Sequence, residues 1–309
     1  MNIFRKPALL SILLLLIVFG FENQPVLAQS STDRTNFEVT ELQAIIVATL
    51  TGYNEEGHHI SRSTPHERTE TADYLEQTFE QLGLIPLRDN YKMPNVNGLV
   101  DLLLAPYKGR NVFSVLKSTE SSKEYVLMGA HYDSEPETPG AIDNASGVAV
   151  TFAIADLIKQ QNHRKYNYIF VLFDQEEDDE VGSKAFVRFL KEKQYKIHST
   201  HVLDVIGWGD SDTLAFEAQV SDDFIERMYR KTATRLDIPL NITGGRGHSD
   251  NKSFNLAGYH SAGFWDDNLT PHIHKPSDTY ETVNFDRLRL ATYFMFELLT
   301  NLDSSYDEL

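Results

Sequence analysis

The chain of 309 residues contains no cysteine. Disulfide bonds and thiolate metal ligands are therefore excluded, and any metal ion must be held by histidine, aspartate and glutamate. Basic residues are also scarce, because 28 Lys and Arg stand against 45 Asp and Glu, which gives a net charge of −17. Such a surface repels phosphate backbones, so we expect no nucleic-acid partner.

A long apolar run stands at the N-terminus. Residues 1–21, MNIFRKPALLSILLLLIVFGF, place two basic residues ahead of this run, and the small residues of VLA end at Ala28. The pattern predicts a signal peptide at residues 1–28, with an uncleaved anchor as the alternative. We expect an exported protein, periplasmic or extracellular, with no membrane span after cleavage. Residues 29–309 are long enough for a single large α/β domain.

Periodicity predicts the order of helices and strands. Apolar residues recur at helical spacing first, an irregular stretch follows at 85–112, and apolar runs then alternate with helical patterns. This order is typical of an α/β fold, in which helices cover both faces of a sheet and ligands collect at the carboxyl ends of the strands. Helices are predicted at 36–52, 66–84, 147–160 and 183–193, and strands at 123–130, 166–174 and 201–208.

Polar residues that follow the strand at 123–130 are the first candidates for a site. His131 and Asp133 stand two apart in extended chain and point to the same side. An aspartate beside a histidine fixes the imidazole tautomer and leaves the other ring nitrogen for a metal ion, although a solvated surface histidine has the same pattern. Asp143, just before the helix at 147–160, is either an N-cap or a carboxylate held rigidly enough to bridge two cations.

The acidic run FDQEEDDEVGS, 173–183, follows the strand at 166–174. Runs of exposed charge are usually solvated, and this interpretation holds for residues 178–180, which face water or shape the loop. Glu176 and Glu177 leave the strand first, and adjacent side chains diverge at a strand end. One of them can therefore bind a metal ion while the other reaches a metal-bound water.

Two later elements complete the candidates. Asp204 interrupts the apolar strand at 201–208, and a buried carboxylate requires a cation, either a metal ion or an Arg or Lys. PHIHKPSDTYE, 271–281, offers His272 or His274 as a second imidazole ligand, whereas Asp278 can instead belong to a turn that positions the loop.

The gathered side chains suit zinc, because they offer nitrogen and oxygen but no sulfur. Two imidazoles and three carboxylates are too many for one tetrahedral ion, but two Zn²⁺ ions that share one carboxylate use all five. Glu176 is then left free. The five predicted ligands are His131, Asp143, Glu177, Asp204 and His274.

The segments AHYDS, GAIDNASGVA, FDQEEDDEVGS, VLDVIG and IHKPSDTYE resemble, in order and spacing, the signature of the co-catalytic zinc aminopeptidases of the bacterial leucyl aminopeptidase type. The resemblance covers roughly residues 40–300, well over half of the chain. It implies the zinc-peptidase fold, a mixed, mostly parallel sheet of about eight strands between helices. It also implies that residues 29–309 form one zinc peptidase catalytic domain.

The same resemblance implies a reaction and a role for each candidate. The reaction is hydrolysis at the free amino end of a peptide, in which Glu176 takes a proton from water and delivers it to the leaving amine. His131 and Asp204 would hold one zinc ion, Glu177 and His274 the other, with Asp143 as the bridge and Asp133 orienting His131.

The chain departs from the family pattern in one segment. Family members commonly read Ser-Asp-His ahead of the last helix, where this chain has Ser249, Asp250 and Asn251, and they often place a tyrosine shortly before, where this chain reads ITGGRGHSD. His248 could replace that tyrosine as a donor to the oxyanion. His248 and Asp250 are therefore candidates for contacts with the substrate or with the ligands.

Three other functions stay open. Glutaminyl cyclases share this fold with a single zinc ion, and a non-catalytic relative could use it as a binding module, although no ligand or base is missing here. A serine hydrolase is the third alternative, because residues 247–251 look like a nucleophile elbow without its last glycine. That elbow requires a strong strand before it, and LNITGGR is predicted to be a poor one.

Overall fold

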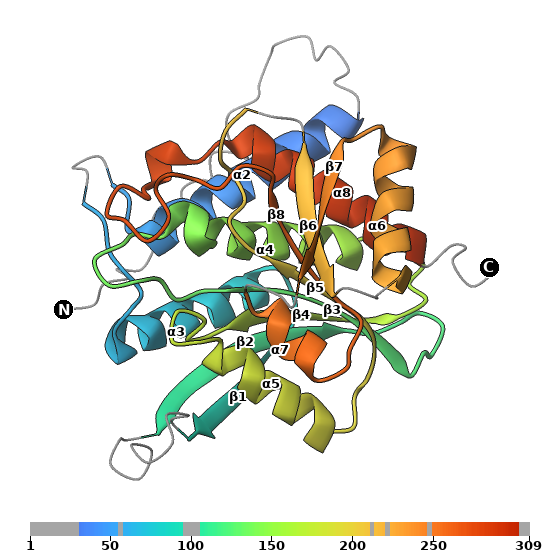
Figure 1. Cartoon of the computed structure of the whole chain (residues 1–309), viewed down its shortest axis with the longest axis horizontal. Coiled ribbons are helices and arrows are strands. Elements are labelled where there is room, and N and C mark those ends of the chain that lie inside the picture. Colours follow the sequence, from blue (N-terminus) through green and yellow to red (C-terminus); the bar gives the residue numbers. More distant parts are fainter. Residues whose placement is uncertain are drawn as a thin grey trace, which may run out of the picture.

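The computed structural model describes residues 31–54, 58–94, 106–210, 213–219, 223–245 and 249–302. Within these residues one sheet of eight strands has the order β1-β2-β4-β3-β5-β8-β6-β7 (Figure 1). The strands are β1 (Pro86–Met93), β2 (Tyr107–Leu116), β3 (Glu124–His131), β4 (Asn167–Phe173), β5 (Lys196–Leu203), β6 (Leu214–Gln219), β7 (Leu240–Gly245) and β8 (Ser261–Asp266).

The centre of the sheet is parallel. Strands β4, β3, β5 and β8 run in the same direction, while β1, β2 and β4 pair antiparallel at one side and β6 is antiparallel to β8 at the other. Strand β4 is buried along its whole length, as its unbroken apolar run predicts for a strand covered on both faces. The mixed, mostly parallel sheet predicted from the sequence is confirmed.

Helices lie on both faces of the sheet, as Figure 1 shows. One face packs against α2, α3, α4, α6 and α8 around the larger apolar core, and the other packs against α5 and α7 around a smaller one. The helices are α2 (Ser31–Thr51), α3 (Pro65–Gln81), α4 (Ser146–Lys159), α5 (Val181–Glu192), α6 (Asp223–Leu236), α7 (Asn251–Leu256) and α8 (Phe285–Leu302), with a 3-10 turn at Tyr280–Thr282.

The start of α3 illustrates how local sequence fixes an element. The Thr64 hydroxyl accepts a hydrogen bond from the Glu67 amide (3.3 Å), and the Glu67 carboxylate accepts one from the Thr64 amide (2.8 Å). Pro65 occupies the first helical position, where no backbone donor is needed. This reciprocal cap starts the helix one residue before the predicted boundary.

Two predictions about strands are wrong. The described part of the stretch 85–112 is not irregular, because it contains β1 and the beginning of β2. In the edge strand β1 the buried residues are Asp89 and Tyr91, so apolar alternation is weak. Residues 240–245 of LNITGGR, which was predicted to be a poor strand, form the edge strand β7. Asp204 does not interrupt a strand, since β5 ends at Leu203 and the chain turns at Val205, whose φ is +48°.

One helical stretch in the described part of the chain, Ala141–Lys159, is long and apolar enough to cross a membrane by length and composition. Because 89% of its apolar window is buried inside the fold, it is the core helix α4 with the turn that precedes it. The predicted signal peptide, residues 1–28, lies outside the described residues.

Candidate active site

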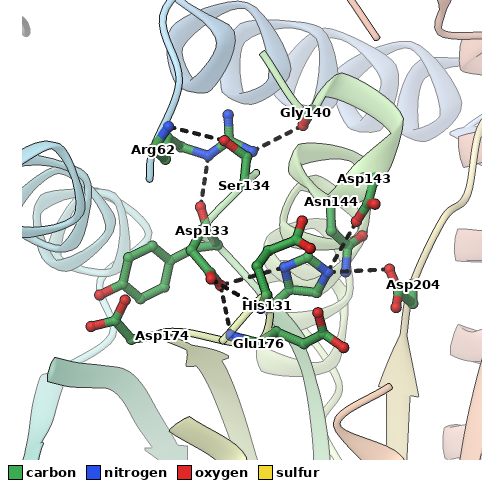
Figure 2. Close-up of polar contacts among 12 residues, drawn as sticks. Arg62, His131, Asp133, Ser134, Gly140, Asp143, Asn144, Asp174, Glu176 and Asp204 are labelled. Carbon is green, nitrogen blue, oxygen red and sulfur yellow. Dashed lines mark hydrogen bonds and ion pairs between the residues drawn. The ribbon is translucent and has the colours of Figure 1, made fainter. Parts of the chain in front are cut away.

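The candidate side chains meet at the carboxyl ends of the central parallel strands. His131 is the last residue of β3, Asp204 follows the last residue of β5, and Glu176 stands three residues beyond β4. From β3 the chain continues to β4 on one side of β3, and from β4 it crosses to β5 on the other side of β3, so the site lies where the strand order reverses. Figure 2 shows His131 between Asp143 and Asp204.

Four short separations connect the predicted ligands. His131 Nε2 lies 3.2 Å from Asp143 Oδ1 and 3.3 Å from Asp204 Oδ1. His274 Nε2 lies 3.2 Å from Asp143 Oδ2 and 3.3 Å from Glu177 Oε2. Asp143 therefore presents one carboxylate oxygen to each imidazole, and all five residues that the sequence singled out come together.

These separations fit zinc. In a tetrahedral site with bonds of about 2.0–2.1 Å to nitrogen and oxygen, neighbouring ligand atoms lie about 3.3–3.4 Å apart. The four measured separations, 3.2 to 3.3 Å, match that edge length on both sides of Asp143. In addition, Glu177 Oε1 is buried and has no hydrogen-bond partner within the described part of the chain, as expected of an oxygen that binds a cation.

Asp133 connects two parts of the site. Its Oδ1 accepts a hydrogen bond from the Glu176 amide (3.0 Å), and its Oδ2 accepts one from the Glu177 amide (3.2 Å). Oδ1 also lies 3.5 Å from His131 Nδ1, on the side of the ring that faces away from Asp143. Asp133 is thus close enough to orient the imidazole, but its shorter contacts fix the backbone of the two glutamates.

The turn before α4 places Asp143. The Asp278 carboxylate accepts hydrogen bonds from the amides of Ile142 (2.9 Å) and Asp143 (3.0 Å), so Asp278 does position this loop. The N-cap alternative for Asp143 is wrong, because its carboxylate faces the two imidazoles. The Asn144 side chain, one residue before the N-cap Ala145, supports the first turn of α4 instead, since its Oδ1 accepts a hydrogen bond from the Gly147 amide (3.0 Å).

Arg62 is a positioning residue that belongs to no sequence motif. Its guanidinium is fully buried and donates to the carbonyls of Tyr132 (2.6 Å) and Gly140 (2.9 Å), while its amide donates to the Ser134 hydroxyl (3.0 Å), as Figure 2 shows. Burial lowers the pKa of Arg62 to about 10, which leaves it charged at neutral pH. A single side chain therefore holds both ends of the loop between His131 and Asp143.

Asn111, in β2, closes the loop that contains the two glutamates. Its Oδ1 accepts a hydrogen bond from the Asp174 amide (3.1 Å), and its Nδ2 donates to the Gly182 carbonyl (2.9 Å). A Cβ atom on Gly182 would lie 1.9 Å from the Asp174 carbonyl oxygen, so only glycine fits there. Sequence patterns could not find this contact, because Asn111 is distant in the chain from Asp174 and Gly182 and its strand, β2, was not predicted.

The acidic run is less solvated than its composition suggests. Asp178 and Asp179 are exposed, as expected of a solvated loop. Glu180 is buried instead, and its carboxylate pairs with Lys252 (2.7 Å) and Lys184 (3.2 Å). Glu180 therefore shapes the loop by connecting the beginning of α5 with α7.

A cavity of about 450 Å³ opens beside these groups. Its charged lining is acidic apart from His274, and it includes Glu176, Glu177 and the half-buried Glu135. The apolar part of the lining contains Val205, Trp265, Leu269 and Ile273. The cavity is large enough for a small organic group and joins an apolar wall to a negatively charged one.

Burial dominates the electrostatics of the acids. It raises the pKa of Glu177 to about 8 and holds the pKa of Glu176 well above its usual range. Asp143 differs, since the two imidazoles outweigh its burial and lower its pKa. The hydrogen bond to Asp143 raises the pKa of His274 to about 9, and the carboxylates around His131 raise its pKa despite full burial. This concentration of buried negative charge favours a bound cation.

The segment that departs from the family pattern lies beside this cluster. Asp250 is fully buried, and burial raises its pKa to about 8, while the neighbouring Ser183 hydroxyl opposes that rise. Ser249 lines the cavity, and its hydroxyl has no hydrogen-bond partner among the described residues, so it contacts no described base of the kind that a serine hydrolase requires. His248 lies outside the described residues.

His272, the other histidine of the loop at 271–281, is not near the ligand atoms. Its Nδ1 lies 2.9 Å from the Ser277 hydroxyl, and its ring meets that of Trp208 edge-on. His274 is therefore the imidazole of this loop that faces the site, and its backbone is left-handed with φ +55°. Such a backbone costs about 1–2 kcal/mol in a residue other than glycine, and it often marks a functional position.

Comparisons with known sequences identify relatives of the chain. The profile of peptidase family M28 matches residues 111–299. Aminopeptidase YwaD of Bacillus subtilis is 33% identical over 178 residues, which are 54% of this chain and 39% of that protein. The chain therefore matches well under half the length of this curated relative.

Solved structures show the same fold at low identity. BSAP, a zinc aminopeptidase from Bacillus subtilis, superimposes with a TM-score of 0.72 at 17% identity, over 85% of this chain and 95% of that one. A glutaminyl cyclase of Bacteroides thetaiotaomicron superimposes with a TM-score of 0.69 at 18% identity, over 85% of this chain and 97% of that one. The fold alone is therefore compatible with either class of enzyme.

Proposed function

Because the chain belongs to peptidase family M28, we propose that it is a zinc metallo-aminopeptidase that hydrolyses the N-terminal peptide bond of peptides with a free N-terminus. The observation that carries the proposal is the position of Asp143. Its two carboxylate oxygens each lie 3.2 Å from a different imidazole, which is the arrangement that a bridging ligand between two ions requires. The name of the relative YwaD, an aminopeptidase, supports the choice of reaction.

Two zinc ions would be held by the five side chains that meet in the site. Two dications would offset the charge of four of the carboxylates there, which the imidazoles alone do not balance. When bound, such a pair polarises a carbonyl oxygen and lowers the pKa of water. One ion would be held by His131 and Asp204, the other by Glu177 and His274, with Asp143 shared.

Glu176 is proposed as the general base. Its carboxylate lines the cavity, and its backbone is fixed by the hydrogen bond to Asp133 (3.0 Å). Burial raises its pKa, while nearby cations would draw that pKa back down. A carboxylate balanced in this way can take a proton from water near neutral pH and hand it to the leaving amine.

A single-zinc glutaminyl cyclase is the alternative that the fold supports. The geometry favours the peptidase. With a single zinc ion, either the pair His131 and Asp204 or the pair Glu177 and His274 would hold no cation. A non-catalytic binding module is favoured less, since the base and all five ligands are present. Metal content separates the first two classes, since one zinc ion per chain together with cyclised glutaminyl peptides would point to the cyclase.

The proposal also includes the location of the protein outside the cytoplasm. We propose that residues 1–28 direct export and are then removed, which leaves residues 29–309 as the catalytic domain, without a membrane anchor. The intact mass of the protein recovered from the medium or periplasm tests this. A mass that includes residues 1–28 would contradict cleavage.

The decisive experiment is an activity panel on the purified protein. Aminoacyl p-nitroanilides and short peptides are offered with free or acetylated N-termini, with and without chelator, and zinc is measured by elemental analysis. We expect two zinc ions per chain, cleavage of the free N-termini, and loss of activity with chelator that added zinc reverses. Cleavage of blocked peptides alone would overturn the aminopeptidase assignment.

A further inference from the structure

A second cavity lies on the face of the sheet that α5 covers, beside the strands β1 and β2 (Figure 1). Its volume is about 630 Å³, which is within the usual range for small-molecule sites. Tyr125 lines it near the beginning of β3, whereas His131 of the candidate active site ends that strand. The two residues are therefore about 20 Å apart along the extended strand.

Four aromatic rings follow one another along the wall of this cavity. The ring centroids of Phe113 and Phe189 are 5.4 Å apart, those of Phe189 and Tyr195 are 6.0 Å apart, and those of Tyr195 and Tyr125 are 4.7 Å apart. Leu87 extends the apolar surface at the edge of the sheet. Rings that pack on one another keep their positions, so the row offers a preformed apolar wall to a flat molecule.

The charge of the lining is only positive. Among the described residues it contains three basic side chains and no acid, although the net charge of the chain is −17. Arg88 is already paired with Glu76 of α3 (2.5 Å). Lys123 and Lys193 are exposed, and within the described part of the chain their ammonium groups have neither a hydrogen bond nor an ion pair. Two uncompensated cations beside an apolar wall suit an organic anion.

The acids that are adjacent to these lysines in the sequence are directed to other cations. Glu124 pairs with Lys196 (2.6 Å), and the Glu192 carboxylate lies 3.8 Å from the Arg188 guanidinium. The two cavities of the molecule therefore have opposite character, since the charged lining of the candidate active site is acidic apart from one histidine.

The backbone at both lysines is fixed. The buried Asn167 side chain donates hydrogen bonds to the carbonyls of the residues on both sides of Lys123, at 2.8 and 2.9 Å. At the end of α5 the Tyr195 amide donates to the Leu190 carbonyl (2.9 Å), and Lys193 lies within the turn that this bond closes. Little ordering of the backbone is therefore needed when a ligand binds.

We propose that this cavity binds a small organic anion with a flat apolar body, of the arylcarboxylate class. The row of rings packs against the body of the ligand. Lys123 and Lys193 donate hydrogen bonds to its carboxylate, which their long flexible stems can reach. The inference is independent of the proposed function, because the two cavities share no lining residue and this one requires no metal.

The test is a calorimetric titration of the purified protein with 2-naphthoate. We expect one site with a Kd below about 1 mM. Lys123→Gln and Lys193→Gln should each weaken binding about 10-fold, because each removes a charge-assisted hydrogen bond. The matched control is Lys191→Gln, which removes the same charge from the last turn of α5 at a residue outside the lining, and it should leave the Kd unchanged. All three lysines are exposed, so the fold should persist.

Two further probes separate the charge from the ring. We expect 2-naphthamide, which has the same rings without the charge, to bind the wild-type protein about 10-fold more weakly and to be insensitive to both lysine substitutions. Acetate, which has the charge without the rings, should show no measurable binding. Tyr195→Leu removes one ring of the wall and should also weaken the binding of 2-naphthoate, with circular dichroism as the check that this variant is folded.

Three results would overturn the inference. The first is the absence of 2-naphthoate binding to the wild-type protein up to about 10 mM. The second is an equal loss in Lys191→Gln and in the two variants of the lining, which would assign the effect to surface charge in general. The third is binding that disappears when a chelator removes metal and that neither lysine of the lining affects, which would place the probe in the candidate active site.

Discussion

The two imidazoles of the site share Asp143 but lie in different surroundings. His131 ends β3 and its side chain is 0% exposed, whereas the side chain of His274, in the loop between β8 and α8, is 53% exposed. One half of the site is therefore built by the sheet and is rigid. The other half is completed by a loop at the mouth of the cavity. We therefore expect substitutions in the two halves to have different effects on stability and on zinc release.

The largest effect on turnover is expected for a substitution of the proposed general base, Glu176. Glu176→Gln should lower kcat about 10²- to 10⁴-fold, because the proton of the attacking water loses its acceptor, while zinc content stays the same. Glu177→Gln is the matched control in the same dipeptide and should lose zinc affinity instead. If both variants keep their activity and zinc, the acidic run is only a solvated loop.

Stability should separate the two imidazoles. In metal-free protein His131→Ala should lower the free energy of unfolding by about 3–5 kcal/mol, because Asp133 and Asp204 then lose the cation they face in the buried interior. His274→Ala should change it by less than about 1 kcal/mol, since the loop side chain is half exposed. Denaturant titrations measure both values, and equal losses would contradict the division into a rigid and an exposed half.

Metal removal should proceed in two steps. The ion next to His274 should leave first and at least about tenfold faster, because His131 is also supported by Asp133 on its other ring nitrogen. Release of zinc into a colorimetric chelator, followed over time, gives both rates. A single phase that releases both ions together would mean that Asp143 couples the halves too tightly for them to act separately.

A third imidazole, that of the buried His201, has hydroxyl groups rather than carboxylates as its neighbours. His201 is as buried as His131 but faces the hydroxyls of Ser199 (3.0 Å) and Tyr229 (3.0 Å), and burial lowers its pKa to about 3. The unfolded chain therefore takes up a proton below about pH 6.5 that the native protein does not. The stability from neutral His201 is complete above that pH and is lost as the pH falls toward 3.

The measurement is the pH dependence of unfolding in wild-type protein and in His201→Gln. Between pH 7 and pH 5 the wild-type protein should lose about 2 kcal/mol more than the variant, which has no imidazole to protonate at this position. Parallel curves would show that His201 is already charged in the native protein.

The sequence predicted the centre of the molecule better than its edges. Strands β3 and β4 and helix α4 are buried and have strong apolar patterns, and the polar residues that follow the two strands and precede the helix lie together in the structure. The family match confirms the resemblance that five short motifs indicated. Roles of individual ligands stay predictions until metal is measured.

What escaped prediction depends on contacts between distant segments. Strands β1 and β7 lie at the edges, where one side faces water and periodicity fades. Arg62 and Asn111 belong to no motif, because their importance comes from what they touch: carbonyls and amide groups. The pattern of a single sequence carries no signal for such contacts.

The two hydrogen bonds of the Asn111 side chain limit where residues can be inserted or deleted in the protein. Both ends of the segment 174–182 are hydrogen-bonded to one side chain, and Asp133 holds the two amides near its middle. Deleting or adding a residue between Asp174 and Glu176 would shift both the base and the ligand out of register with Asp133. The exposed tip at Asp178 and Asp179 is free of that constraint, so a reporter peptide or label could be grafted there, at the entrance of the cavity, without changing the spacing that matters.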